Sequence, residues 1–167
     1  MKLKNLKHTP IEIAQVLASN QKIVSLLYND SEFALTAPAP TIPIGELINN
    51  DYIGFYPATE SGIKNIERNS FIIINLEDFS LQTTDNNTTA SGAIYITTDK
   101  SHCLLAENKL RLLELADEID STLDGQKLSS AGQIRLTSVN YVVFSDFRSG
   151  YRINFRINDQ QHRKAEL

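Results

Sequence analysis

Apolar and polar residues alternate along the C-terminal part of the chain. In residues 150–159, GYRINFRIND, every second residue after the glycine is apolar. This two-residue period predicts a strand with one buried face. A second run at 133–144 precedes a turn at 146–150, so the two strands should pair as an antiparallel hairpin. The polar face of the last strand then carries Arg152, Asn154, Arg156 and Asn158.

Three earlier runs also predict strands. Residues 52–56 form a short candidate strand that Pro57 stops. The run FIIINL, near the start of residues 71–82, is apolar nearly throughout, as in a strand covered on both faces. The polar residues 85–92 predict a turn or flexible loop. The sheet is expected to resume at 93–98, which makes a possible hairpin with the preceding run.

Helical periodicity marks three other segments. Near the N-terminus, Thr9 and Glu12 have the spacing of a capping box, and the proline between them suits the first helical position. Asn20 is expected to cap a second, short helix. The one long helix is predicted at about 106–123. Its core stripe consists of Leu112, Leu115, Ala116, Ile119 and Leu123.

This order of elements predicts a single α+β domain over residues 1–167. An antiparallel (mixed) sheet, with one long helix packed across a face and short N-terminal helices, buries every apolar face economically. We divide the domain into four parts: N-terminal helices at 1–35, a Pro-rich arm or loop at 36–50, the sheet plus long helix at 51–158, and a polar tail at 159–167. The prolines at 36–43 suit either a surface connection or an arm that lies on a neighbouring subunit.

The distribution of charge along the chain says more about possible partners than the overall composition does. The net charge of −4 gives no general attraction to nucleic acid or to an anionic membrane, and the N-terminal sequence MKLKNLK predicts neither a signal peptide nor a membrane anchor. The charges are unevenly spread: residues 28–99 are acidic with two bases, Lys64 and Arg68, whereas residues 148–167 are mainly basic. Opposite patches suit head-to-tail contacts between identical copies, and ordinary surface variation is the alternative.

Candidate catalytic chemistry is sparse. The single cysteine, Cys103, rules out an internal disulfide, and the three histidines are too scattered to suggest a metal site. His102 is adjacent to Cys103, but neighbours along a strand point to opposite faces, which argues against a nucleophile–base pair. We therefore expect no cofactor and no metal. The acidic residues of the long helix can share a cation or act as paired carboxylates, although a solvated face is the commoner arrangement: Glu114, Asp117, Glu118 and Asp120.

The Arg/Asn face of the last strand has three candidate roles. Arg152 and Arg156, with Arg148 and Arg135, can contact phosphates, but the aromatic residues of this strand point the other way and provide no base-stacking platform. A solvated rim is the second role. The third, which we favour, is a subunit contact between these arginines and the acids of a neighbour's helix.

Two stretches resemble a known family. The run EIDSTLDGQKLSSAGQIRL, followed by a strand, a turn and SGYRINFRI, resembles the C-terminal half of tailed-bacteriophage tail terminator or tail-completion proteins. Upstream, KIVSLLYND resembles a short helical element of phage neck proteins. The resemblance covers mainly residues 93–158 and does not extend to residues 29–90.

The resemblance implies a non-enzymatic virion protein, assembled in the host cytoplasm. Such proteins form a ring, usually a hexamer, on the last ring of the tail tube; they stop tube growth and join the tail to the head connector. DNA passes through the lumen without sequence recognition. In this chain the expected subunit-interface or lumen residues are Arg148, Arg152, Asn154, Arg156, Glu114, Asp117 and Glu118.

Three alternatives remain open from the sequence. The protein can be another neck or head-completion adaptor, because the order of elements hardly separates these from terminators. It can be a small cytoplasmic enzyme with a site on the acidic helix face and His102. It can also be a monomeric binding module whose ligand is the Pro-rich segment.

Overall fold

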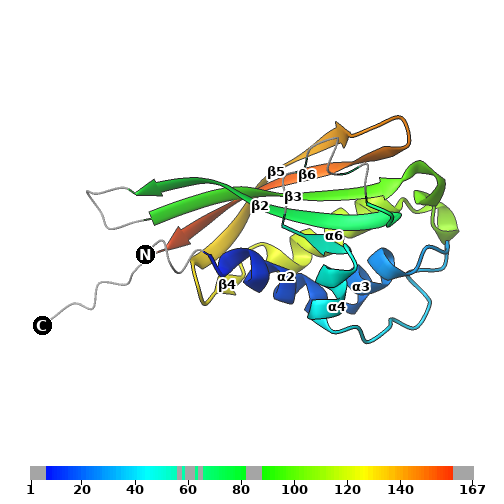
Figure 1. The fold of residues 1–167 in the computed structure, drawn as a ribbon, viewed down its shortest axis with the longest axis horizontal. Coiled ribbons are helices and arrows are strands. Elements are labelled where there is room, and N and C mark those ends of the chain that lie inside the picture. The colour runs from blue at the N-terminus through cyan, green and yellow to red at the C-terminus, as the bar shows by residue number, and fades with distance from the viewer. Residues whose placement is uncertain (1–6, 56–57, 59–62, 64–65, 82–87, 160–167) are drawn as a thin grey trace, which may run out of the picture.

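A mixed six-stranded sheet with helices on one face forms the body of the protein, which confirms the predicted α+β class (Figure 1). The computed structural model describes residues 7–55, 58, 63, 66–81 and 88–159. The strands are β1 (Ile53–Gly54), β2 (Ser70–Leu81), β3 (Thr88–Asp99), β4 (Lys127–Leu128), β5 (Gly132–Val143) and β6 (Arg148–Asp159). The helices are α2 (Thr9–Ser19), α3 (Gln21–Tyr28), α4 (Ile44–Asn49) and α6 (Arg111–Leu123).

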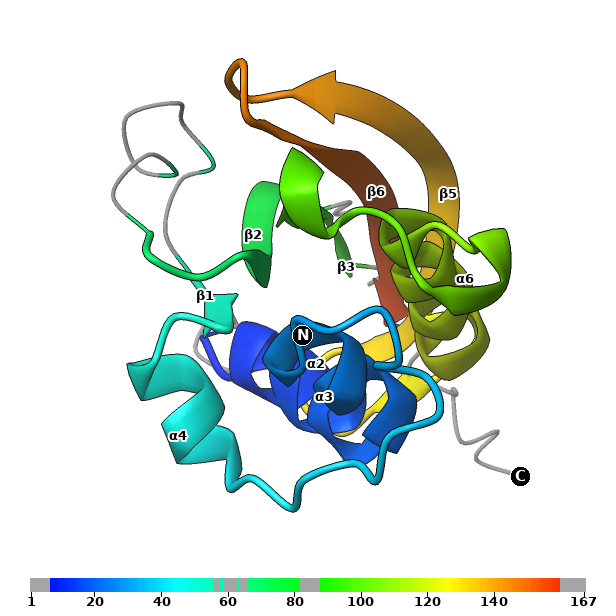
Figure 2. The same cartoon turned by 90° about the vertical axis from the view of Figure 1, so that its right-hand side faces the viewer.

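The strand order is β1-β2-β3-β6-β5-β4, with β1 parallel to β2 and every other pair antiparallel. The predicted hairpin of the last two strands is confirmed, with Tyr141 opposite Tyr151. The predicted pairing of 71–82 with the following strand is also confirmed, with Ile74 opposite Ile94. The sheet is strongly curled, so that β5 and β6 arch away from the helices at their hairpin end (Figure 2).

Two predicted strand limits are wrong. Residues 88–92, expected in a polar loop, belong to β3, because β3 continues alongside β6 as far as the pair Thr88–Asp159. Residues 85–87 of that predicted loop lie outside the described residues, as do residues 160–167 of the predicted polar tail. Within the described part of the strand expected at 52–56, only the two residues of β1 form a strand, and residue 56 lies outside the described residues.

The long helix begins five residues later than predicted. Glu107 and Asn108 have φ values of 62° and 59°, a left-handed conformation that ends the short 3₁₀ turn at Ala106–Asn108 and prevents a continuous helix. The helix therefore starts at Arg111 and has 13 residues, against 11 in α2. The predicted arm at 36–50 is also partly helical, since α4 occupies its second half and buries Leu47.

The capping box predicted at the N-terminus does not form. The N-cap position is His8, which makes no side-chain cap, and Thr9 already lies within the helix. Thr9 is buried, with its Oγ1 3.2 Å from Ser130 Oγ. The Asn20 cap is confirmed: its Oδ1 accepts hydrogen bonds from the backbone N–H groups of Lys22 and Ile23.

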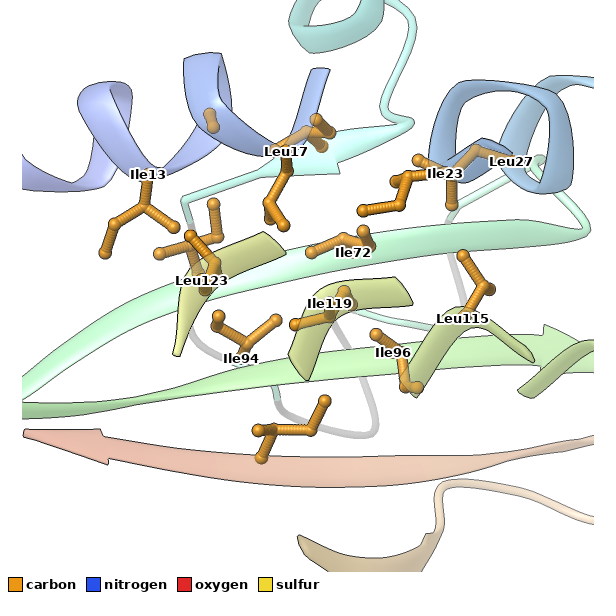
Figure 3. Close-up of a cluster of buried hydrophobic side chains, with 14 of the residues drawn as sticks. Ile13, Leu17, Ile23, Leu27, Ile72, Ile94, Ile96, Leu115, Ile119 and Leu123 are labelled. Carbon is orange, nitrogen blue, oxygen red and sulfur yellow. The ribbon is translucent and has the colours of Figure 1, made fainter. Parts of the chain in front are cut away.

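The main core lies between the helices and one face of the sheet (Figure 3). The predicted stripe of α6 is confirmed, because Leu112, Leu115, Ile119 and Leu123 are buried and Ala116 packs against them. A smaller core lies on the opposite face of the sheet and consists of Ile63, Ile66, Phe71, Ile73 and Phe144. Residues 71–74 of β2 are therefore covered on both faces, as the apolar run at 71–76 predicted.

Candidate interaction surface

The polar side chains of β6 lie on the sheet face away from the helices. Phe155 and Ile157 are buried in the main core, and successive strand residues point to opposite faces, so Arg156 between them points outward. Arg156 is exposed, and among the described residues no side chain or carbonyl pairs with its guanidinium. Asn154 lies beside it and donates from Nδ2 to Ser138 Oγ at 2.8 Å.

Arg152 is held inside the subunit, unlike its neighbour. Its Nη2 lies 2.5 Å from Glu77 Oε2 on β2, and its Cζ lies 5.6 Å from the centre of the Tyr95 ring on β3. The Tyr95 hydroxyl also donates to Glu77 Oε1 at 3.3 Å. The pKa of Tyr95 is raised by burial, although the charge of Arg152 opposes the shift. Arg152 thus links three strands and has an acidic partner within its own subunit.

Arg148 also acts within the chain. Its Nη1 donates to Ile63 O at 2.9 Å, and its Nη2 donates to Ile66 O at 2.6 Å and Arg68 O at 3.0 Å. Its Cζ lies 5.3 Å from the centre of the Phe71 ring. These contacts hold Ile63, Ile66 and Arg68 next to β6, so Arg148 already has partners within its own subunit.

The acidic residues of α6 also differ in whether they have partners inside the subunit. Glu118 Oε1 pairs with Lys22 Nζ at 2.8 Å, and Glu118 Oε2 accepts from Asn20 Nδ2 at 3.0 Å. Burial would raise the pKa of Glu118, but the hydrogen bonds from Lys22 and Asn20 lower it. Glu118 therefore joins α6 to the start of α3. Asp117 and Asp120 are exposed and Glu114 is half-buried on the side of α6 away from the sheet.

Candidate metal and nucleophile chemistry is not assembled in the part of the chain that the structure describes. None of these residues form a group of three or more metal-ligating side chains. His102 and Cys103 lie in and just after a 3₁₀ turn rather than on a strand. The Cys103 thiol points to Asp99 O at 3.5 Å, while His102 Nδ1 lies 2.8 Å from Ser101 Oγ. Burial raises the pKa of Cys103, which lowers its thiolate fraction and its reactivity.

An open depression of about 430 Å³ lies beside α2. His8, Glu12, Ser129 and Ser130 contribute to its wall. The Glu12 carboxylate accepts hydrogen bonds from the backbone N–H and hydroxyl groups of both serines. Burial opposes ionisation, but the hydrogen bonds from Ser130 and Ser129 outweigh it and lower the pKa of Glu12 to about 2. So weak a base cannot activate a nucleophile near neutral pH, and we assign this carboxylate a structural role.

Arg111, the largest fully buried side chain among the described residues, was not predicted from the sequence. Its Nη1 donates to Leu26 O at 2.6 Å and Asn29 O at 2.8 Å, its Nη2 to Ser31 O at 2.8 Å, and its Nε to His102 O at 2.9 Å. Two of these acceptors are carbonyls at the C-terminal end of α3, which lack helical partners and carry the negative end of the helix dipole. A signal was present, because Arg111 precedes Leu115 by four residues and so continues the core stripe.

A second missed feature is an exposed apolar row on β5. Val139, Tyr141 and Val143 have exposed fractions of 54%, 59% and 63%. They lie opposite β6 residues of the helix-facing side, as the pairs Val139–Ile153 and Tyr141–Tyr151 indicate. The alternation of apolar residues at 139, 141 and 143 was visible in the sequence, but their exposure depends on where the helices end.

These surfaces define an α+β protein with an exposed arginine on β6, exposed acidic residues on α6 and an exposed apolar row on β5. The chain matches the YomW family over residues 20–157 and belongs to that family. No curated protein matches it. Within the described residues, no helix combines the length and hydropathy needed to cross a bilayer.

Proposed function

We propose that this protein is a structural virion component whose copies form a ring at the head-proximal end of a phage tail. In that role the ring caps the tail tube, stops its growth and joins it to the head connector, with DNA passing through the lumen. The proposal is supported by the resemblance of residues 93–158 to tail terminator proteins. It is also supported by the distribution of exposed charge over the surface of the subunit.

The observation that carries the proposal is the position of two charged surfaces on opposite sides of the subunit. The arginine face, Asn154, Arg156 and Asn158, lies on the outer side of the sheet. The acidic face, Glu114, Asp117 and Asp120, lies on α6 outside its buried stripe, and α6 itself packs against the other side of the sheet (Figure 1). Head-to-tail contacts in a closed ring join two different surfaces of each copy, so opposite charges on opposite sides suit this geometry.

Internal contacts narrow the set of interface residues expected from the sequence. Arg148, Arg152 and Glu118 each have partners within the subunit. The expected contact therefore depends on Arg156 and Asn154 from the arginine face. Glu114 and Asp117 are its counterparts on the acidic face. A single exposed ion pair contributes only about 0.2–1 kcal/mol, so the contact needs several pairs and the repetition that a ring provides.

A charge-exchange experiment tests the ring. Arg156→Glu and Asp117→Arg are expected to abolish rings individually, and the double variant is expected to restore them because the ion pair is re-formed with reversed sign. Lys109→Glu is the control: Lys109 is exposed, belongs to neither charged face, and has its nearest described carboxylate at 3.9 Å, from Glu107. Negative-stain electron microscopy, alone and on purified tail tubes, gives the readout. Rings that survive both single changes would contradict the proposed contact.

The symmetry of such rings distinguishes the terminator from another neck adaptor. Six-fold rings on the end of a tail tube agree with termination, whereas twelve-fold rings favour a head-completion adaptor. Particles assembled with Arg156→Glu should carry tails of uncontrolled length if the protein terminates the tube. Tails of normal length in those particles would exclude the terminator role while leaving a head-side role open.

A further inference from the structure

Strand β5 has an open edge over residues 137–143. On one side it pairs with β6 along its length, whereas β4 covers its other side only at Gly132 and Gln133. The residues that follow α6 contact this side of β5 as far as Leu136, whose backbone N–H donates to Asp124 Oδ1 at 2.9 Å. Beyond that point no described segment pairs with the free side of β5.

The backbone of this open edge is oriented for pairing. At the hairpin end, the Phe144 N–H donates to Arg148 O, so Phe144 bonds toward β6. Bonding alternates along an antiparallel pair, so Val139, Tyr141 and Val143 direct their N–H and C=O groups away from β6. These three residues are also the ones whose apolar side chains are exposed.

Apart from the register shift between Leu136 and Ser138 at its start, the open edge carries none of the usual protection against pairing. Residues 137–143, TSVNYVV, contain no charged residue, no proline and no glycine. Edge strands normally use such residues, or a covering segment, to prevent association with another chain. In a chain that is 22% charged, an uncharged edge of this kind is suited to a partner that brings no charge of its own.

We propose that the partner is a second copy of this chain, paired β5 to β5 in antiparallel orientation about a two-fold axis at Asn140. Asn140 is the midpoint of the open edge, so this register pairs residues 138–142 of the two copies, and Thr137 lies in the register shift of β5. This pairing places Val139 opposite Tyr141 of the second copy, which keeps apolar side chains together on one face of a continuous sheet. Val139 and Tyr141 would also exchange backbone hydrogen bonds with each other across the axis.

The charges that flank the open edge also match in this register. Arg135, which is exposed and pairs with Asp124 Oδ2 at 3.2 Å within its own subunit, precedes the edge, and Asp146 follows it. Antiparallel pairing about Asn140 brings Arg135 of each copy to the end of the edge at which Asp146 of the other copy lies. A parallel pairing would instead bring like charges together at both ends. The antiparallel two-fold arrangement is therefore favoured by charge as well as by side-chain packing.

This dimer goes beyond the proposed ring and does not depend on it. Two-fold pairing joins the same surface of both copies, whereas the ring joins two different surfaces. The residues also differ, since the ring uses the arginine and acidic faces and the dimer uses the β5 edge.

A cysteine placed on the two-fold axis gives the sharpest test. In the background Cys103→Ser, Asn140→Cys would place two thiols on directly opposed residues with Cα atoms about 4.5 Å apart, within the range of a disulfide. Ser138→Cys is the matched control, because Ser138 is also exposed on β5 but would lie roughly 13 Å from its own copy along the strand. We expect oxidation to cross-link the first variant nearly completely and the second hardly at all. Equal cross-linking of both, or of neither, overturns the two-fold register.

A second measurement keeps the proposal independent of thiol chemistry. Light scattering on a concentration series of the full chain should show a dimer for the wild-type protein. Tyr141→Lys should raise the dimer dissociation constant at least about tenfold, because each copy then presents a charge to the apolar edge of the other. Circular dichroism should show that the variant is folded. A strictly monomeric wild-type protein, or a dimer that Tyr141→Lys leaves unchanged, overturns the proposal. If the charge variants lose the ring but keep this dimer, the result tests only the proposed ring contact and leaves the dimer proposal unaffected.

Discussion

Replacing Arg111 by methionine should lower the free energy of unfolding more than almost any other single substitution of a charged residue. The guanidinium is fully buried and donates four hydrogen bonds, to carbonyls of Leu26, Asn29, Ser31 and His102. Burial lowers the pKa of Arg111, and the charge of the nearby Asp30 opposes this shift. No carboxylate hydrogen-bonds to this cation among the described residues, so the carbonyls at the end of α3 stabilise it.

The magnitude follows from those four acceptors. Methionine fills part of the volume but donates no hydrogen bond, so Leu26 O loses a fully buried donor, at a cost of about 1–3 kcal/mol. The other three acceptors are partly buried, so water can replace some of the lost bonds, at a cost of about 0.5–1 kcal/mol each. Relief of the desolvation of the guanidinium offsets part of this sum. We expect a loss of about 3 kcal/mol in the free energy of unfolding.

Urea denaturation followed by circular dichroism measures this loss. At about 2–4 °C per kcal/mol for a domain of this size, the melting temperature should fall by roughly 6–12 °C. Arg111→Lys should recover only part of the stability, since one ammonium group cannot reach four carbonyls in the geometry of the planar guanidinium. Arg135→Met is the control, because Arg135 forms an exposed ion pair with Asp124 and should cost under about 1 kcal/mol. If Arg111→Met costs no more than this control, the assigned role of the buried guanidinium is refuted.

Three further predictions concern stability. Glu12 has a pKa of about 2 in the folded protein against 4.5 unperturbed, so its contribution to the free energy of unfolding is full above pH 4.5 and is lost as the pH falls toward 2. With solvent screening we expect this contribution to be about 1–2 kcal/mol and to be absent in Glu12→Gln. Equal pH dependence of unfolding in the wild type and the variant would contradict this. Arg148→Ala should remove the hydrogen bonds to the carbonyls of Ile63, Ile66 and Arg68 and lower the free energy of unfolding by about 2–4 kcal/mol. Amide-exchange protection near Ile66 should fall, and unchanged protection there would contradict this role. Gly150→Ala should cost more than about 2 kcal/mol in thermal melts, because a Cβ there would overlap Ile96 O on β3; a melting temperature equal to the wild type would show that the strands can separate.

Local patterns were enough to predict most of the elements. The two-residue period of 150–159 gave the last strand and its buried face, and the helical stripe around Leu115 and Ile119 gave the buried face of α6. The Asn20 cap was also predictable, because a cap involves only the residue and the next three. The boundary of α6 was not, since the left-handed conformations of Glu107 and Asn108 interrupt a sequence that is compatible with helix.

The roles of the charged side chains were largely unpredictable from the sequence. Arg148 and Arg152 were expected at a subunit interface, but their acceptors are more than 70 residues away in the chain. Glu12 was expected to cap its own helix, and instead binds a turn 117 residues later. Arginine and glutamate side chains are long, and their partners are chosen by whichever segments the fold brings within reach.

The sequence by itself determined the class of fold, the buried faces of the main strands and of α6, and the division of β6 into apolar and polar faces, because these depend on periodicity over a few residues. Tertiary structure alone decided which charges are internal and which remain on the surface, and it left the edge of β5 uncovered. The physical reason is that hydrogen-bond partners and burial depend on contacts between segments distant in the chain, and no local pattern records those distances.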